Sequence, residues 1–323
     1  MKAAIYKKYG SPDVIQIKEA KKTTPKPNEV LVKIHASSIN SWDWDMLTGK
    51  PRLYRLLFGL FKPKYNILGI DIAGTIESCG TDTNQFKPGD EIFGDISEIN
   101  FGGFSEYICV PEHLLVLKSP KMSFEQAAAL PHVGLLAIQC IQQFGEIKPN
   151  VKVLINGAGG GVGSIAIPYL KQRGAEITCV DKAIKEEYLK KLGANHFIDY
   201  TKSKFVNENK KYDYIIDNKA TFSSKQYASV LNDGGIYAAS GGAVSCIMKM
   251  QFAKKRTLKR TGKTVGLVIY KPNQKDLTKI RDLFEQGIIQ VHIDKVYALE
   301  NIREAFEYFG SEDYLGKVAV KVV

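Results

Sequence analysis

Five glycines separate a short apolar run from a segment with helical periodicity. The run 151–155 leads into residues 156–164, and the glycines are Gly157, Gly159, Gly160, Gly161 and Gly163. Glycine lets the chain turn tightly and lets a phosphate approach the backbone, while the next helix offers unbonded N–H groups and a partial positive charge. The strict GxGxxG spelling fails, because Ala158 stands at its first position. We nevertheless predict a loop that binds the pyrophosphate of a dinucleotide, made of Ala158, Gly159, Gly160, Gly161, Val162 and Gly163. A glycine-rich turn without a ligand is the alternative.

A carboxylate follows this loop at the distance where dinucleotide-binding folds contact the ribose. Asp181 lies 21 residues after Gly160, at the end of the apolar run 176–180. A carboxylate there accepts a hydrogen bond from the ribose 2′-OH and repels a 2′-phosphate, which favours NAD. Lys182 and Lys185 come next, and an ammonium group could bind the phosphate of NADP. The residues therefore leave NADH and NADPH both open, together with a structural role for Asp181 as a helix N-cap.

The elements around the loop alternate between two periodicities. Short apolar runs typical of buried strands alternate with segments of helical period, which predicts a parallel sheet wound on both faces. The expected strands are 151–155, 176–180, 196–199, 212–217, 235–239 and 264–269, and the expected helices are 161–171, 185–192 and 224–231. Pro168 lies inside the first of these helices, so a bend is expected there. Polar residues 218–220 follow the fourth strand.

The first 120 residues have a different pattern, with strands, turns and little helix. Alternating or β-rich runs predict strands at 30–35, 70–77, 91–93 and 104–110. Ser123 and Gln126 form a capping-box pattern that begins a helix, with a second helix expected over 134–144. The tail should contain a helix over 275–286 and strands near Lys295 and Val318. Because these elements are too few to fold alone, we expect the tail to rejoin the first domain.

Composition excludes several classes of protein. The 323 residues are 44% hydrophobic and 24% charged, as in an average globular protein, and no run suits a membrane span or a signal peptide. We therefore expect a soluble cytoplasmic enzyme. The net charge is +11, but only seven of the 45 basic residues are arginine and the lysines are dispersed, so nucleic acid is not an expected partner. The five cysteines are widely spaced, which predicts buried thiols instead of disulfides or a zinc knuckle.

Two segments combine apolar and basic residues. Residues 53–65 are apolar, aromatic and basic, and we interpret them as a pocket wall or core with snorkelling basic side chains, with membrane contact the disfavoured alternative. Residues 248–263 carry seven basic side chains and resemble a basic amphipathic helix. A solvated helix face is the expected role, and a subunit contact is the alternative.

The order and spacing of short motifs along nearly the whole chain resemble the medium-chain dehydrogenase/reductase superfamily, in its zinc-free quinone oxidoreductase branch. The matching segments are 1–4, 9–14, 28–33, 40–43, 69–74, 86–90, 103–107, 157–163, 192–194, 198–200 and 316–318. The resemblance implies an α/β protein with two domains. A GroES-like β-rich catalytic domain would span 1–122 and 271–323, and a Rossmann domain with a doubly wound parallel sheet would span 123–270. It also implies a homodimer, with substrate and nicotinamide meeting between the domains.

The same resemblance bears on metal chemistry. Zinc-dependent relatives hold the catalytic metal with Cys, His and Cys, and the corresponding positions here are Asn40, Ile70 and about Ala129. The four-cysteine lobe of those relatives is also absent between Asp90 and Phe104. The family therefore implies zinc-free transfer of a hydride from NADPH or NADH to a small hydrophobic electrophile, a quinone or an α,β-unsaturated carbonyl compound. The alternatives are a zinc-free dehydrogenase of another carbonyl compound and a non-catalytic protein that binds NADPH.

Catalytic positions follow from the resemblance as well. Negative charge that develops on a carbonyl oxygen needs a hydrogen-bond donor, and Asn40 is the candidate. Asp43 would orient a water or a neighbouring side chain, and Tyr54 is a candidate proton donor. For Asn40 and Asp43 the structural alternative is a pair that stabilises a turn.

The resemblance assigns further contacts to the cofactor. Tyr200 would lie near the adenosine, with an exposed aromatic residue after a strand as the alternative. Lys317 would reach the cofactor from the returning tail, with a solvated lysine as the alternative. The residues expected beside the nicotinamide ribose are Ser240, Gly241 and Gly242.

Overall fold

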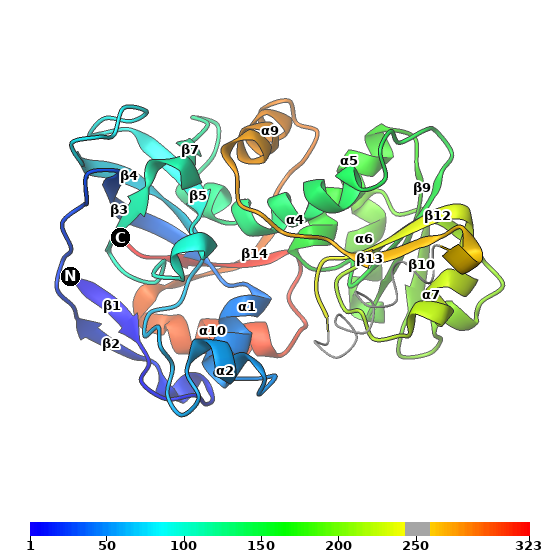
Figure 1. Cartoon of the computed structure of the whole chain (residues 1–323), viewed down its shortest axis with the longest axis horizontal. Helices are drawn as coiled ribbons and strands as arrows, with labels where there is room; N and C mark the ends of the chain where they lie inside the picture. The colour runs from blue at the N-terminus through cyan, green and yellow to red at the C-terminus, as the bar shows by residue number, and fades with distance from the viewer. Residues whose placement is uncertain (243–258) are drawn as a thin grey trace. The chain divides into compact units, whose positions relative to one another are not determined.

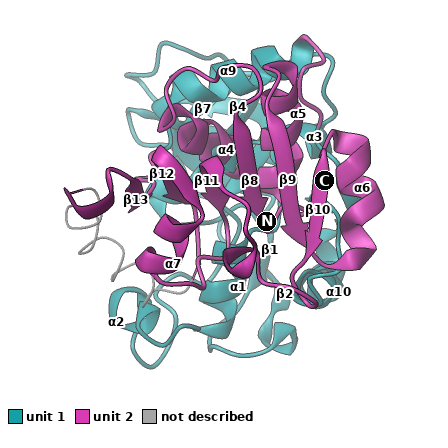
Figure 2. Cartoon of the chain, turned by 90° about the vertical axis from the view of Figure 1, so that its right-hand side faces the viewer, with its two compact units in different colours: residues 1–132, 272–285, 291–323 teal, residues 133–271, 286–290 magenta. Residues whose placement is uncertain are grey.

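The structure is a computed structural model that describes residues 1–242 and 259–323. The chain forms two compact units, coloured separately in Figure 2. The first unit comprises residues 1–132, 272–285 and 291–323, and the second comprises 133–271 and 286–290. Residues 123–132 belong to the first unit because helix α3 (Phe124–Ala128) lies against strands β3 and β4. Ser123 and Gln126 cap that helix reciprocally, as the sequence predicts.

The first unit is built on a seven-stranded sheet in the order β14-β15-β3-β4-β5-β7, with β6 also paired to β3. Figure 1 labels β3, β4, β5, β7 and β14 of this sheet. The tail strands β14 and β15 join this sheet through β3, which confirms that the tail returns to the first unit. Strands β1 and β2 form a separate antiparallel pair. The bounds are β1 Lys2–Ile5, β2 Gln16–Glu19, β3 Glu29–Ser38, β4 Asp71–Cys79, β5 Glu91–Asp95, β6 Tyr107–Pro111, β7 Leu115–Leu117, β14 Ile293–Ala298 and β15 Lys317–Lys321.

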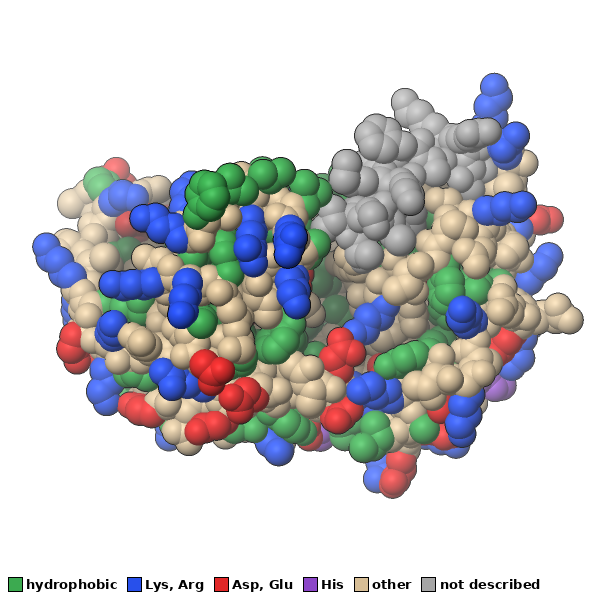
Figure 3. Space-filling model, turned by 90° about the horizontal axis from the view of Figure 1, so that it is seen from below, with side chains coloured by type: hydrophobic (Ala, Val, Ile, Leu, Met, Phe, Trp, Pro, Cys, Tyr) green, Lys and Arg blue, Asp and Glu red, His purple; other side chains and the backbone are tan. Residues whose placement is uncertain are grey.

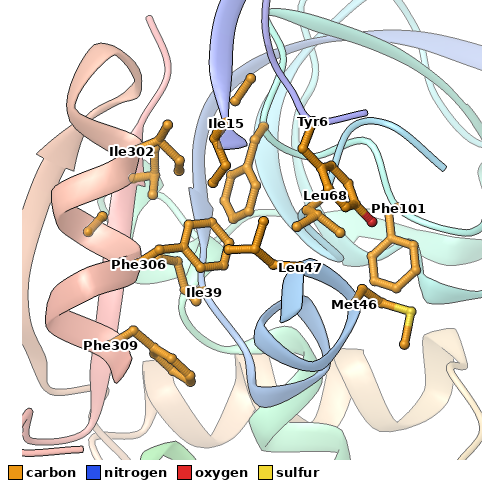
Figure 4. Close-up of a cluster of buried hydrophobic side chains, with 14 of the residues drawn as sticks. Tyr6, Ile15, Ile39, Met46, Leu47, Leu68, Phe101, Ile302, Phe306 and Phe309 are labelled. Atoms are coloured by element: carbon orange, nitrogen blue, oxygen red, sulfur yellow. The ribbon is translucent and has the colours of Figure 1, made fainter. Parts of the chain in front are cut away.

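Helices α1 (Ser41–Thr48) and α10 (Ile302–Gly310) enclose an apolar cluster of this unit, drawn in Figure 4. Phe306 of α10 is fully buried and packs edge-to-face on Phe104, with ring centroids 5.7 Å apart. Neither helix was expected from the sequence. The cluster joins residues from both ends of the chain, so the returning tail forms part of the core that supports α1.

The second unit contains a six-stranded parallel sheet in the order β10-β9-β8-β11-β12-β13. This confirms the predicted parallel sheet and every strand assigned to it. The strands are β8 Lys152–Asn156, β9 Glu176–Asp181, β10 His196–Asp199, β11 Tyr212–Asp217, β12 Leu231–Ala239 and β13 Thr264–Leu267. The helices are α4 Pro131–Gln142, α5 Gly161–Gln172, α6 Glu186–Leu192 and α7 Ser224–Ser229, while α9 Gln274–Glu285 belongs mainly to the first unit. Helix α5 is assigned continuously across Pro168.

Several expectations differ in detail from the structure. Strand β6 begins at Tyr107, later than the expected 104, and most of the basic segment 248–263 lies outside the described residues. Cys140 and Cys179 are buried free thiols, whereas Cys79 and Cys109 are partly exposed and Cys246 lies outside the described residues.

No helix within 1–242 and 259–323 is long and apolar enough to cross a membrane.

Candidate active site and cofactor loop

The glycine loop lies at the point where the strand order of the second unit reverses. Strand β8 has β9 on one side and β11 on the other, and the loop follows β8 directly and leads into α5. In open parallel sheets ligands bind beyond the carboxyl ends of the strands at this reversal point. The loop therefore occupies the position where a dinucleotide is expected.

The loop backbone fits a phosphate group. Gly160 is the N-cap of α5 and no side chain caps the helix there, while the first N–H groups of any α-helix have no partner within it. A Cβ placed on Gly160 would have only the Gly157 carbonyl oxygen nearby, at 3.8 Å, so this face of the loop is open. At Gly163 a Cβ would lie 1.9 Å from the Ala158 carbonyl oxygen. One glycine thus leaves room for a ligand, and the other allows close packing of loop and helix.

Asp181 at the end of β9 is bound to the loop itself. Its carboxylate accepts hydrogen bonds from the backbone N–H groups of Gly159 at 2.7 Å and Lys182 at 2.8 Å. The Lys185 ammonium lies 3.9 Å from the same carboxylate, and both side chains are largely buried. The Asp181 charge is therefore used within the protein to hold the loop and is partly balanced by Lys185. Tyr200, 44% exposed, donates its backbone N–H to the Asp181 carbonyl oxygen at 3.3 Å.

The carboxyl ends of three neighbouring strands are joined by one amide side chain that sequence reasoning did not assign. Asn218, directly after β11, donates to the carbonyl oxygens of Asn156 at 3.0 Å and Gly157 at 3.3 Å. Its own side-chain oxygen accepts from Ser240, directly after β12. The polar segment 218–220 therefore fixes the edge of the sheet. The predicted ribose-side residues Ser240, Gly241 and Gly242 lie at this same edge, and Gly242 has a positive φ of 120°.

The first unit contains a buried polar network whose members are aligned by strand register. Ser38 pairs with Asp71 across β3 and β4, and Asp71 pairs with Asp95 across β4 and β5. The Asp71 carboxylate accepts from the Ser38 hydroxyl at 2.8 Å and from the backbone N–H of His132 at 2.8 Å. The Asp95 carboxylate lies 2.8 Å from Nδ1 of His132. The sheet thereby places two buried carboxylates side by side.

Lys317 inserts its ammonium group into this network. The Nζ atom donates to Oδ1 of Asn40 at 2.6 Å and to the Ile39 carbonyl oxygen at 3.2 Å, and lies 3.4 Å from the Asp71 carboxylate. The residue is only 2% exposed, so the alternative of a solvated lysine is wrong. Burial lowers the pKa of Lys317, and the carboxylates of Asp71 and Asp43 act in the opposite direction. The amine is a fixed part of the first unit.

Asn40 and Asp43 are both buried, and both are held by hydrogen bonds. The Asn40 Nδ2 group donates to Asp71 at 2.8 Å, so the amide is oriented between Lys317 and Asp71. Asp43 accepts from the backbone N–H groups of Asn40 at 2.9 Å and Gly69 at 2.8 Å. Burial raises the pKa of Asp43 to about 7, although these two hydrogen bonds lower it. Both residues thus make the turn-stabilising contacts of the structural alternative, and their catalytic roles stay predictions.

The remaining predicted catalytic residue and one unpredicted residue also belong to the first unit. Tyr54 at the start of helix α2 (Tyr54–Phe58) is half-buried, and burial raises the pKa of its hydroxyl. His132, which sequence reasoning passed over, places its ring 6.5 Å from that of Trp42. In the sequence, His132 could have been noticed only because it follows Pro131 at the start of α4. Its partners Asp71 and Asp95 lie 61 and 37 residues earlier in the chain.

Comparisons with known proteins agree with this architecture. The family model described as "Alcohol dehydrogenase GroES-like domain" matches residues 26–121, and the one described as "Zinc-binding dehydrogenase" matches residues 192–320. The chain is 30% identical to the 2-methylene-furan-3-one reductase of Solanum lycopersicum, covering 99% of this chain and 79% of that protein. It is 29% identical to an NADPH-dependent alkenal/one oxidoreductase of Arabidopsis thaliana, covering 99% of this chain and 79% of that protein.

Among solved structures, the quinone oxidoreductase from Coxiella burnetii matches with a TM-score of 0.84 and 26% identity, covering 100% of this chain and 99% of that one. The fold and the relatives define an NAD(P)H-dependent oxidoreductase with a GroES-like and a Rossmann-like part. The chain belongs to the medium-chain dehydrogenase/reductase superfamily, in the branch of the quinone oxidoreductases.

Proposed function

We propose that this protein is an NADPH-dependent reductase of quinones or α,β-unsaturated carbonyl compounds and that it acts without zinc. The observation that carries the proposal is the uncapped N-terminus of α5 with the open face at Gly160, placed where the strand order reverses. A bound nicotinamide dinucleotide supplies the hydride. The Gly160–Val162 backbone would bind its pyrophosphate, and the edge held by Asn218 and Ser240 would lie beside its ribose.

Among the predicted catalytic residues of the first unit, we propose that Asn40 and Asp43 hold the structure of the site and that Tyr54 donates a hydrogen bond. Asn40 is held between Lys317 and Asp71, so its amide group has a fixed orientation. Tyr54 carries a hydroxyl whose raised pKa keeps it protonated near neutral pH. We assign Tyr54 to donate a hydrogen bond to the acceptor's carbonyl oxygen, where negative charge develops. Asp43 acts as a positioning residue, because its two oxygens bind backbone N–H groups.

The donor set argues against a catalytic zinc ion in the first unit. Zinc sites in proteins use Cys, His and carboxylate ligands. Around Asn40 the available oxygen atoms already surround the Lys317 ammonium, a cation that would repel a metal ion. We expect activity to survive dialysis against a chelator. Loss of activity with EDTA and its recovery with Zn²⁺ alone would contradict the zinc-free assignment.

The cofactor loop favours NADPH over NADH. The Asp181 carboxylate binds Gly159, Lys182 and Lys185, so its charge is partly balanced and its oxygens are engaged. A carboxylate held in this way is a weaker partner for a ribose 2′-OH, and the side chain of Lys182, which follows it, would bind a 2′-phosphate. The relevant measurement is kcat/KM for the two nucleotides. Preference for NADPH supports the assignment, and preference for NADH would show that Asp181 contacts the ribose.

A fluorescence titration with each nucleotide, followed by turnover with 9,10-phenanthrenequinone and an alkenal, tests the function as a whole. Binding with turnover is the expected result. Binding without turnover on any acceptor would favour a non-catalytic NADPH-binding protein, and absence of binding would refute the role of the loop.

A further inference from the structure

Residues 50–64 expose an unusual number of apolar side chains. The exposed fractions are 46% for Leu53, 66% for Leu56, 72% for Leu57, 52% for Leu60 and 89% for Phe61. The expectation that this segment is core is therefore wrong for these five residues. Leu53, Leu56 and Leu57 follow the spacing i, i+3, i+4, which places them on one side of α2. Leu60 and Phe61 follow Gly59, where the helix has ended. The face shown in Figure 3 has hydrophobic side chains next to Lys and Arg side chains over the first unit.

The inner side of this segment is firmly attached to the first unit. Tyr54 and Phe58 pack against the apolar cluster, and the Tyr9 hydroxyl donates to the carbonyl oxygens of Phe58 at 3.2 Å and Gly59 at 2.7 Å. Arg55 donates to the Gly49 carbonyl oxygen at 3.0 Å, with its guanidinium 4.5 Å from the centre of the Tyr9 ring. These contacts hold the aromatic side chains inward. The leucines therefore face outward as a consequence of the fold.

The charged residues of this segment all have one sign. Lys50, Arg52, Lys62 and Lys64 are exposed, and the sequence from residue 46 to residue 70 contains no Asp or Glu. None of these four forms an ion pair within the described part of the chain. Long basic side chains can keep their charge in water while their stems cover apolar surface. We call the exposed apolar and basic residues of 50–64 the leucine–lysine surface.

We propose that the leucine–lysine surface docks on an anionic phospholipid bilayer. Leucine and phenylalanine side chains would enter the interface between headgroups and acyl chains, and the flanking ammonium and guanidinium groups would bind lipid phosphates. A second copy of this chain is a poor occupant, because two identical positive surfaces repel each other. A neutral apolar partner would leave the basic residues without counter-charges.

Co-sedimentation of the full chain with vesicles tests this proposal. We expect binding to vesicles of phosphatidylcholine with about 30% phosphatidylglycerol, about tenfold or more tighter than to phosphatidylcholine alone, and weakening at about 0.5 M NaCl. Each basic residue near an anionic surface contributes about fivefold in affinity. The triple variant Arg52→Glu, Lys62→Glu, Lys64→Glu should therefore lose detectable binding. The variant Leu56→Ser, Leu57→Ser, Phe61→Ser should also lose it, because the apolar insertion is removed.

Matched variants on the second unit serve as controls. Ile269→Ser changes an apolar residue that is 81% exposed, and Lys210→Glu with Lys211→Glu reverses two exposed charges. Both controls should bind as the wild type does. Equal binding to neutral and anionic vesicles, equal loss in the controls, or no binding at all would overturn the proposal, as would self-association through this surface in light scattering. The assay reads binding alone, so its result is independent of the reductase assignment.

Discussion

At the scale of single residues, the sequence singled out Asp181 and Asn40 but not the partners that the structure gives them. Asp181 was found from its distance to the glycine loop, and the structure shows its carboxylate bound to Gly159 in that loop. Lys317 was expected to reach a cofactor or water, yet its ammonium contacts Asn40 and Asp71. These contacts join residues more than 240 positions apart, and periodicity carries no information about pairings at that separation.

The buried carboxyl group of Asp43 predicts a pH-dependent stability. Its folded pKa of about 7 lies above the ordinary value of 3.8. The folded state therefore binds the proton more strongly, and this contribution to stability is complete below about pH 4 and disappears as the pH rises through 7. Its size is on the order of 4 kcal/mol. Urea unfolding of wild type and Asp43→Asn between about pH 4 and 8 should show a steeper fall for the wild type. Parallel pH profiles would contradict this interpretation, since the loss of one acceptor oxygen in Asn adds only a constant offset.

The contact between Lys317 and Asp71 predicts that substitutions at these two residues have non-additive effects on the free energy of unfolding. Removing one partner of a buried ion pair leaves an uncompensated charge and costs about 3–5 kcal/mol, so Lys317→Met should destabilise the protein by that amount. Asp71→Asn in the same chain should restore part of the loss, because no buried charge then remains unpaired. A double-mutant cycle in urea at neutral pH measures the coupling. Strictly additive effects would mean that the two groups do not interact.

At the scale of elements, the sequence predicted strands and helices correctly where the hydrophobic pattern of a segment matches its burial in the fold. Strands β10 and β11 match the expected ranges. The central strands β8 and β9 lie within one residue of theirs at each end, because strands buried on both faces read as plain apolar runs. Helix α2 shows the opposite case. Its leucine spacing is typical of a helix that packs its leucines inward, but Tyr54 and Phe58 take the inner side and the leucines are exposed. Periodicity identifies a face of a helix, and only tertiary contacts determine which face is buried.

The glycine loop can be tested with two alanine substitutions that differ in their surroundings. Gly160→Ala adds a Cβ to open space, so we expect unchanged thermal stability and at least about tenfold weaker NADPH binding, because the methyl group occupies the phosphate's place. Gly163→Ala would place a Cβ 1.9 Å from a backbone oxygen and should lower the stability of the protein. Calorimetry and a nucleotide titration distinguish the two. Normal NADPH affinity in Gly160→Ala would show that the phosphate binds elsewhere.

The apolar cluster that joins residues from both ends of the chain can also be tested by substitution. Phe306 is fully buried against Phe104, and truncation of such a side chain costs about 3–5 kcal/mol. Phe306→Ala should therefore lower the midpoint of urea unfolding. Tyr308→Ala, on the same helix but only partly buried, is the matched comparison and should cost less. An equal effect of both substitutions would contradict the assignment of Phe306 to this core.

At the scale of the whole molecule, composition and motif order sufficed for the class of protein, and the detailed division of the chain came from packing. The second unit takes residues 286–290 from within the tail, and the first takes residues 123–132 from the predicted Rossmann segment. Short connecting segments of this kind have no distinct composition. Each unit contains one of the two polar sites. The buried network around Lys317 lies in the first unit, and the glycine loop lies in the second.

The proposed activity delivers hydride to a conjugated acceptor and not to an isolated carbonyl carbon. The most direct measurement is the position of deuterium after turnover of an α,β-unsaturated ketone with NADPH deuterated at C4 of the nicotinamide. We predict a saturated ketone labelled at the β-carbon. An allylic alcohol labelled at the carbinol carbon would instead identify a carbonyl dehydrogenase and contradict the assignment as a quinone or enone reductase.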